Sequence, residues 1–172
     1  MERTFNRPAG GRDFASKGRN LEIPVNVRVR FICVMVHKKK DDDSLGMLLG
    51  AWAPGESYHG AECWHHLYFS EEALDMAAMV VGPMTGIDTT QPPWTFNDDD
   101  LIGKGIVATT EEHEFNGRET VRIVPWTVGE WHPTAAEQKE IDQIIAKRVK
   151  RGDNADNEGE GATSTTVDDI KF

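Results

Sequence analysis

An Asn-Gly pair at residues 116 and 117 constrains the fold of this chain more than any other feature. A two-residue Asn-Gly loop between alternating segments favours a tight hairpin, so residues 104–115 and 118–126 are predicted to be antiparallel strands. The loop length also fixes the register, which places Phe115 opposite Arg118 and Glu111 opposite Arg122. Because side chains alternate between the two faces of a sheet, these four residues are expected to share one face.

Three further strands are predicted before the hairpin, at residues 23–36, 45–53 and 61–69. The first of them alternates between apolar and polar residues as far as Phe31 and is entirely apolar from there to Val36. A strand with two such halves is either buried on both faces in its second half or shifted from one face to the other at a bulge.

Two helices complete the expected elements. Ser70 is a good N-cap, and the Gly82-Pro83 pair ends the apolar stripe that follows it, so a helix is expected between them. A terminal helix is expected over residues 135–151. The order of three strands, a helix, two strands and a helix favours a mainly β fold, namely an OB-fold-like five-stranded barrel with an inserted helix and a C-terminal helix. Another small β-barrel or sandwich with peripheral helices is the alternative.

The candidate chemistry is that of a surface for single-stranded nucleic acid, on which aromatic rings stack with bases and arginines contact phosphates. Trp64, His66 and Tyr68 are expected on one face of the third predicted strand. The residues predicted to bind single-stranded DNA are Arg28, Arg30, Trp52, Trp64, Tyr68, Lys104, Phe115, Arg118 and Arg122. Two alternatives stay open: each aromatic can pack in a core, and the hairpin can be a solvated edge with a cross-strand ion pair.

The net charge of −10 counts against nucleic-acid binding, for which a basic protein is expected. The charge is unevenly distributed, however. Arginine and lysine are in excess in residues 1–20, whereas acidic runs occupy residues 41–43 and 98–100. Binding requires a local positive strip rather than a positive total, so the overall charge does not exclude it.

The sequence predicts no catalytic, metal or cofactor site. Phosphate-binding loops, nucleophile elbows and zinc-protease motifs are absent from it. His59, Cys63, His65 and His66 are close together, but no second cluster completes a set of zinc ligands. Cys33 and Cys63 are expected to be reduced and buried. No apolar run is long enough to span a membrane, and residues 1–20 lack an apolar signal region, so neither a membrane partner nor secretion is expected.

The chain is therefore divided into three parts: a flexible basic arm at residues 1–20, an OB-fold-like nucleic-acid-binding domain at residues 21–151, and a disordered acidic tail at residues 152–172. The tail contains almost nothing that could be buried, so it cannot offset its ordering entropy. It nevertheless ends in two carboxylates, an isoleucine and an aromatic ring, a combination suited to a pocket with a basic rim. The residues predicted to bind a protein partner are Asp168, Asp169, Ile170 and Phe172.

This ending resembles the acidic tail tip of bacterial and phage single-stranded-DNA-binding proteins, although Lys171 stands where the bacterial proteins usually have proline. The segment Leu101–Ala108, which leads into the hairpin, resembles the entry to strand 4 of the phage proteins. The resemblance implies a protein that coats single-stranded DNA during phage replication or recombination, in the cytoplasm of a bacterial host cell. It also implies that the tail recruits replication or recombination proteins.

Two other functions remain open from the sequence. The first is an OB-like adaptor that binds protein and not nucleic acid. The second is a magnesium-dependent nuclease that uses Asp98, Asp99 and Asp100, although no matching set of carboxylates and lysine accompanies them. A homo-oligomer is also left open.

Overall fold

The computed structural model describes residues 22–38, 44–91 and 93–156. The basic arm predicted at residues 1–20 and the tail residues Asp168, Asp169, Ile170 and Phe172 lie outside these ranges. In chain order the elements are β1 (Arg28–Lys38), β2 (Ser44–Ala51), β3 (Glu62–Tyr68), α1 (Leu74–Thr85), η3 (Asp98–Leu101), β4 (Gly105–Phe115), β5 (Arg118–Ile123), η4 (Pro125–Thr127), β6 (Gly129–Glu130) and α2 (Ala135–Asp156).

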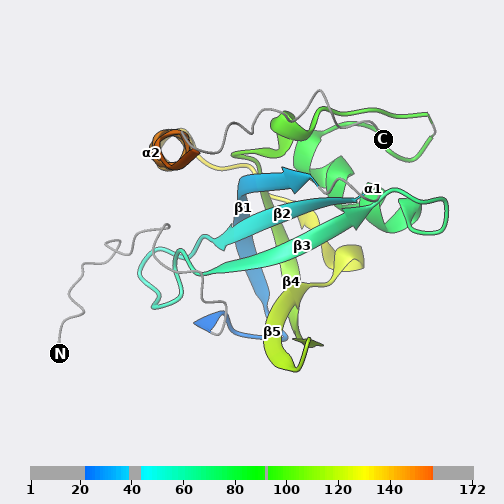
Figure 1. Ribbon diagram of the computed structural model, residues 1–172, viewed down its shortest axis with the longest axis horizontal. Helices are drawn as coiled ribbons and strands as arrows, with labels where there is room; N and C mark the ends of the chain where they lie inside the picture. Colours follow the sequence, from blue (N-terminus) through cyan, green and yellow to red (C-terminus); the bar gives the residue numbers. More distant parts are fainter. Residues whose placement is uncertain (1–21, 39–43, 92, 157–172) are drawn as a thin grey trace.

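The strands form one antiparallel, strongly bent sheet in the order β3-β2-β1-β4-β5, and the two-residue β6 pairs with β4 (Figure 1). The expectation of a mainly β fold with two α-helices is confirmed. The expected five-stranded barrel is not closed, because in the described part of the chain β3 and β5 are the edges of an open sheet and no ladder joins them. Side chains from β3, β5, α1 and η4 line the space between these edges.

The hairpin is built as its sequence predicts. Asn116 and Gly117 both have positive φ, at 54° and 77°, as a type I′ turn requires. Phe115 pairs with Arg118 and Glu111 with Arg122, so the predicted register is confirmed.

The first strand shows the predicted change of character. Its pairing with β2 shifts between Cys33 and Met35, which marks a bulge. Residues 31–34 are all buried, because the two faces of β1 contribute to different apolar clusters. The larger cluster fills the inside of the bend and includes Phe31, whereas the smaller one includes Ile32 and Val34 on the outer side.

Helix α1 differs from its prediction at both ends. It begins at Leu74 and not at Ser70, which belongs to a preceding turn. Pro83 lies inside the last turn of the helix rather than ending it. A proline there removes only one late backbone bond, and the helix ends where Gly86 adopts a left-handed conformation (φ 83°) and donates its N–H to the Gly82 carbonyl.

Helix α2 covers the smaller apolar cluster on the outer side of β1 and β2. A capping box begins it: the Thr134 N–H donates to Glu137 Oε1 at 2.9 Å, and the Glu137 N–H donates to Thr134 Oγ1 at 3.1 Å. Ile141 is its fully buried anchor. The helix continues to Asp156, beyond the end predicted for it at residue 151. No described helix is long and apolar enough to cross a bilayer.

Candidate nucleic-acid interface

Three rings follow one another along the outer face of β3. Trp64, His66 and Tyr68 are all exposed, with 40% of Trp64 and 51% of Tyr68 accessible to solvent. The ring centroids of Trp64 and His66 are 6.1 Å apart, those of His66 and Tyr68 are 6.3 Å apart, and both pairs are near-parallel, with interplanar angles of 20° and 30°. The predicted faces of this strand are thus confirmed, since Cys63 and Leu67 are buried. We call Trp64, His66 and Tyr68 the ring row.

A glycine on the neighbouring strand leaves the space that the ring row occupies. Gly46 of β2 pairs with His66, and a Cβ atom at Gly46 would lie 3.2 Å from two atoms of the His66 ring and 3.3 Å from Trp64 Cζ3. Two of the rings therefore lie over the bare backbone of β2. A side chain at residue 46 would meet them at less than ordinary contact distance.

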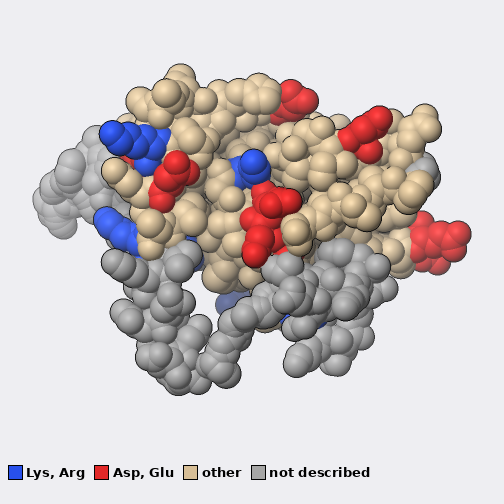
Figure 2. All heavy atoms as spheres, turned by 90° about the horizontal axis from the view of Figure 1, so that it is seen from above, with Lys and Arg blue, Asp and Glu red and all other residues tan. Residues whose placement is uncertain are grey.

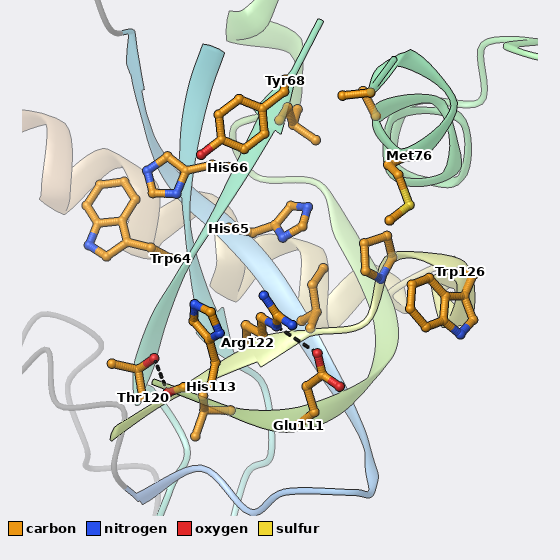
Figure 3. Close-up of a pocket in the computed structure, with 16 residues that line it drawn as sticks. Trp64, His65, His66, Tyr68, Met76, Glu111, His113, Thr120, Arg122 and Trp126 are labelled. Atoms are coloured by element: carbon orange, nitrogen blue, oxygen red, sulfur yellow. Dashed lines mark hydrogen bonds and ion pairs between the residues drawn. The ribbon is translucent and has the colours of Figure 1, made fainter. Parts of the chain in front are cut away.

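A cleft of about 520 Å³ opens beside the ring row, between the unpaired edges of β3 and β5 (Figure 3). Its volume is within the range of small-molecule pockets, about 300–1,000 Å³. Its walls are mostly apolar, and Met76 of α1 and Trp126 of η4 contribute the far side (Figure 3). Trp126 is 65% exposed, an unusual degree for a tryptophan.

The polar groups of the cleft are few and come from β3, β4 and β5. Arg122 donates its Nε–H to Glu111 Oε2 at 2.7 Å, so the predicted cross-strand ion pair forms. His65 points from β3 toward the same space (Figure 3). Burial, followed by the charges of His66 and Arg122, lowers the pKa of His65 to about 4, so its imidazole is neutral at pH 7.

Arg28 and Arg30 lie away from the cleft, on β1. Arg28 donates from Nη1 to the Thr127 carbonyl oxygen at 2.8 Å. The Arg30 guanidinium lies 5.2 Å from the centre of the Trp131 ring and 3.9 Å from Glu137 Oε2. Both arginines are therefore engaged in contacts within the protein, and the structure does not bring them to the ring row.

Trp52 does not belong to a binding surface. Only 1% of it is exposed, and it packs in the smaller apolar cluster against Ile141 and Trp131. Its Nε1–H donates to Glu137 at 3.4 Å. The prediction that Trp52 contacts DNA is corrected, because α2 covers the strand end from which it projects.

The remaining predicted residues are spread along β4 and β5. Lys104 is exposed just before β4 begins, at the end of that strand away from the hairpin loop. Arg118 is exposed at the hairpin tip, opposite Phe115. The side chain of Phe115 is outside the described part of the structure. Of the nine residues predicted to bind DNA, the structure brings together Trp64, Tyr68 and Arg122 at the cleft.

The sequence reasoning missed four parts of this site: His65, Met76 and Trp126, which line the cleft, and Gly46 beneath the ring row. The sequence singled out His65 only as a possible zinc ligand, because nothing in the local pattern showed that β3 would be an unpaired edge with a cleft beside it. The Pro125-Trp126 pair after the hairpin was a usable signal, because a proline-initiated turn ends the strand and can leave the next side chain outside the sheet.

No metal or thiol site accompanies the cleft. In the part of the chain that the structure describes, no group of three His, Cys, Asp or Glu side chains has the geometry to hold a metal ion. Cys33 and Cys63 are both free and buried, and they flank Leu49 on the two neighbouring strands. Two strand spacings separate them by roughly 10 Å, too far for a disulfide. Burial raises the pKa of each thiol to about 12.

One face of the molecule carries both acidic and basic side chains (Figure 2). Figure 2 shows Lys and Arg interspersed with Asp and Glu, without a continuous basic strip over the described residues of that face. That face therefore offers no continuous basic track of the kind that would attract a polyanion along its length.

Comparison with known proteins identifies no relative. The chain matches no protein-family model, and no curated protein sequence matches it.

Proposed function

We propose that this protein binds single-stranded DNA through the ring row and the adjoining cleft. The observation that carries the proposal is the near-parallel series of Trp64, His66 and Tyr68 on one exposed strand face. Bases stack on aromatic rings with little regard to sequence, and each stacked base contributes about 1–3 kcal/mol. Three successive rings therefore provide a platform for consecutive bases of an unpaired strand.

The arrangement of strands supports the same function. An OB fold is a five-stranded, partly open barrel that binds oligonucleotides on its strand 2–3 face and on its loops 1–2 and 4–5. Here the ring row projects from β3 over β2, and the β4–β5 hairpin forms the other side of the cleft. We take the open sheet to be an OB-like barrel whose β3–β5 seam is not closed.

The role that we propose is non-catalytic. The protein would cover exposed single strands during phage replication or recombination in a bacterial host, and residues 168–172 would recruit partner proteins. A pull-down from host lysate compares the parent with Phe172→Ala. Equal recovery of replication or recombination proteins by both would contradict the recruiting role.

Fluorescence anisotropy with labelled oligo-dT tests DNA binding without relying on tryptophan emission. Trp64→Ala and Tyr68→Ala should each weaken binding about 5- to 160-fold, the equivalent of 1–3 kcal/mol. Met79→Ala is a matched control, because Met79 is also exposed but lies on α1 outside the cleft. If the parent protein does not bind oligo-dT, the proposal is wrong.

A protein-binding adaptor is the second candidate. The exposure of Met76 and Trp126 favours it, because these apolar side chains come from α1 and η4 and line one side of the cleft. An adaptor would show no anisotropy change with oligo-dT. Its complexes would be lost in Trp126→Ala.

A further inference from the structure

The cleft contains polar groups that stacking alone does not require. A stacking platform needs only exposed rings, yet the cleft also places Arg122, Glu111 and His65 around one apolar space. Apolar pockets with a few placed polar groups are the usual form of a site that selects one small ligand. Among the parts of a DNA strand, a single base fits that description.

The guanidinium of Arg122 is oriented by its ion pair with Glu111, although 47% of the Arg122 side chain is exposed. Its Nε–H donates to Glu111 Oε2 at 2.7 Å, and its side chain lines the same cleft as His65 of the facing edge strand (Figure 3). Among the described residues, Arg122 forms no other hydrogen bond or ion pair. Because a guanidinium has five N–H donors in a planar fork, its two terminal nitrogens remain as a pair of donors.

The donor pattern selects among the bases. Guanine offers two adjacent acceptors, O6 and N7, which is the arrangement that an arginine fork contacts most often. Adenine offers one acceptor next to an amino donor, and thymine offers a single O4 acceptor on the same edge. Met76, Pro125 and Trp126 supply apolar surfaces against which the base can lie.

We propose that the cleft between β3 and β5 is a pocket for one base turned out of the bound strand, with a preference for guanine imposed by Arg122. This inference rests on the proposed function, since it assumes a bound single strand. Glu111 acts as a positioning residue, because it holds the guanidinium and does not itself need to touch the base. The ring row binds neighbouring bases without selecting among them.

The test compares four labelled strands that differ at one central position: oligo-dT, and oligo-dT with one deoxyguanosine, one 7-deazadeoxyguanosine or one deoxyadenosine. The parent should bind the guanine strand about tenfold more tightly than oligo-dT, in line with one bidentate base contact. The 7-deaza strand lacks N7 and should lose most of that preference. The adenine strand should show none.

Protein variants assign the preference to the cleft. Arg122→Lys keeps the charge but removes the fork, so the guanine preference should disappear. Arg118→Lys, at the hairpin tip, should retain it. Trp64→Ala should weaken the guanine strand and oligo-dT by the same factor.

Two results would overturn the inference and can be told apart. Binding of oligo-dT without any preference for guanine, or a preference that survives in Arg122→Lys, would refute the base pocket and leave the stacking platform intact. Failure of the parent to bind any of the four strands would refute both the pocket and the proposed function.

Discussion

Substituting Gly46 by alanine separates the role of the ring row from the stability of the fold. The new Cβ would lie 3.2 Å from the His66 ring and 3.3 Å from the Trp64 ring, so both rings must move by a few tenths of an ångström. The backbone of residue 46 does not have a positive φ, so alanine itself is not strained there. The rings are exposed side chains and can yield without unpacking the core.

The expected effect on stability is small. Replacing a compatible glycine by alanine stabilises a protein by about 0.4–1 kcal/mol through the unfolded state, which offsets the cost of moving two side chains. The melting temperature should therefore stay within a few degrees of the parent. Binding should weaken by about 1 kcal/mol, or roughly fivefold, because two of the three stacking surfaces are displaced.

Thermal unfolding and oligo-dT anisotropy measure the two effects on the same preparation. Gly82→Ala is the control: its Cβ would also be crowded, 2.8 Å from Thr89 Oγ1, but on α1 and away from the ring row. Binding that is unchanged in Gly46→Ala, or weakened equally in Gly82→Ala, would refute the assignment of the platform to these rings.

Three further predictions concern the salt dependence of binding, the pH dependence of stability and the ion pair that joins α2 to the sheet. The log–log salt dependence of oligo-dT binding should have a slope of about −0.7 to −1.4, from a phosphate contact by Arg118 and, on a strand without guanine, a second one by Arg122; a slope steeper than about −4 would require several more phosphate contacts than these two arginines can make. Burial, followed by the charge of Asp99, raises the pKa of Asp98 to about 6, and its Oδ1 has no hydrogen-bond partner among the described residues. The folded state thus favours the protonated form of Asp98, so the ionised form destabilises the fold at high pH. Asp98→Asn should therefore raise the free energy of unfolding at pH 8 by at most about 3 kcal/mol, and this gain should vanish below about pH 4. Denaturant titrations that show an equal gain at both pH values would contradict the raised pKa of Asp98. A largely buried ion pair between Arg148 Nη2 and Glu62 Oε2, at 2.5 Å, joins α2 to β3. Arg148→Ala should therefore lower the free energy of unfolding by about 2–3 kcal/mol. A loss of less than about 0.5 kcal/mol in a urea titration would show that the pair does not stabilise the fold.

Local rules predicted the hairpin and the faces of β3 correctly. The Asn116-Gly117 turn fixes its own register, because two residues with positive φ can link the strands in only one way. The alternation of Trp64, His66 and Tyr68 against Cys63 and Leu67 needs only the pleat of a strand. Such features depend on neighbours in sequence, so the chain itself carries the information.

Long-range packing accounts for what the sequence did not predict. Whether the edges of β3 and β5 meet depends on side chains from α1 and η4 that line the space between them. The sequence of neither strand shows where those side chains will lie. The burial of Trp52 follows from the position of α2, whose thin apolar stripe around Ile141 did not reveal which strands it would cover. Because β3 and β5 do not pair, the sheet is not a closed barrel, and the cleft lies between these two edges.

Photocross-linking tests the central claim most directly, because it reports which residues touch the bases. An oligo-dT strand in which iodouracil replaces some of the thymines is irradiated with the protein, and the linked peptides are identified by mass spectrometry. The account predicts cross-links to Trp64 and Tyr68 that are lost in Trp64→Ala and Tyr68→Ala. Cross-links confined to peptides around Arg28 and Arg30, with none on β3, would contradict it.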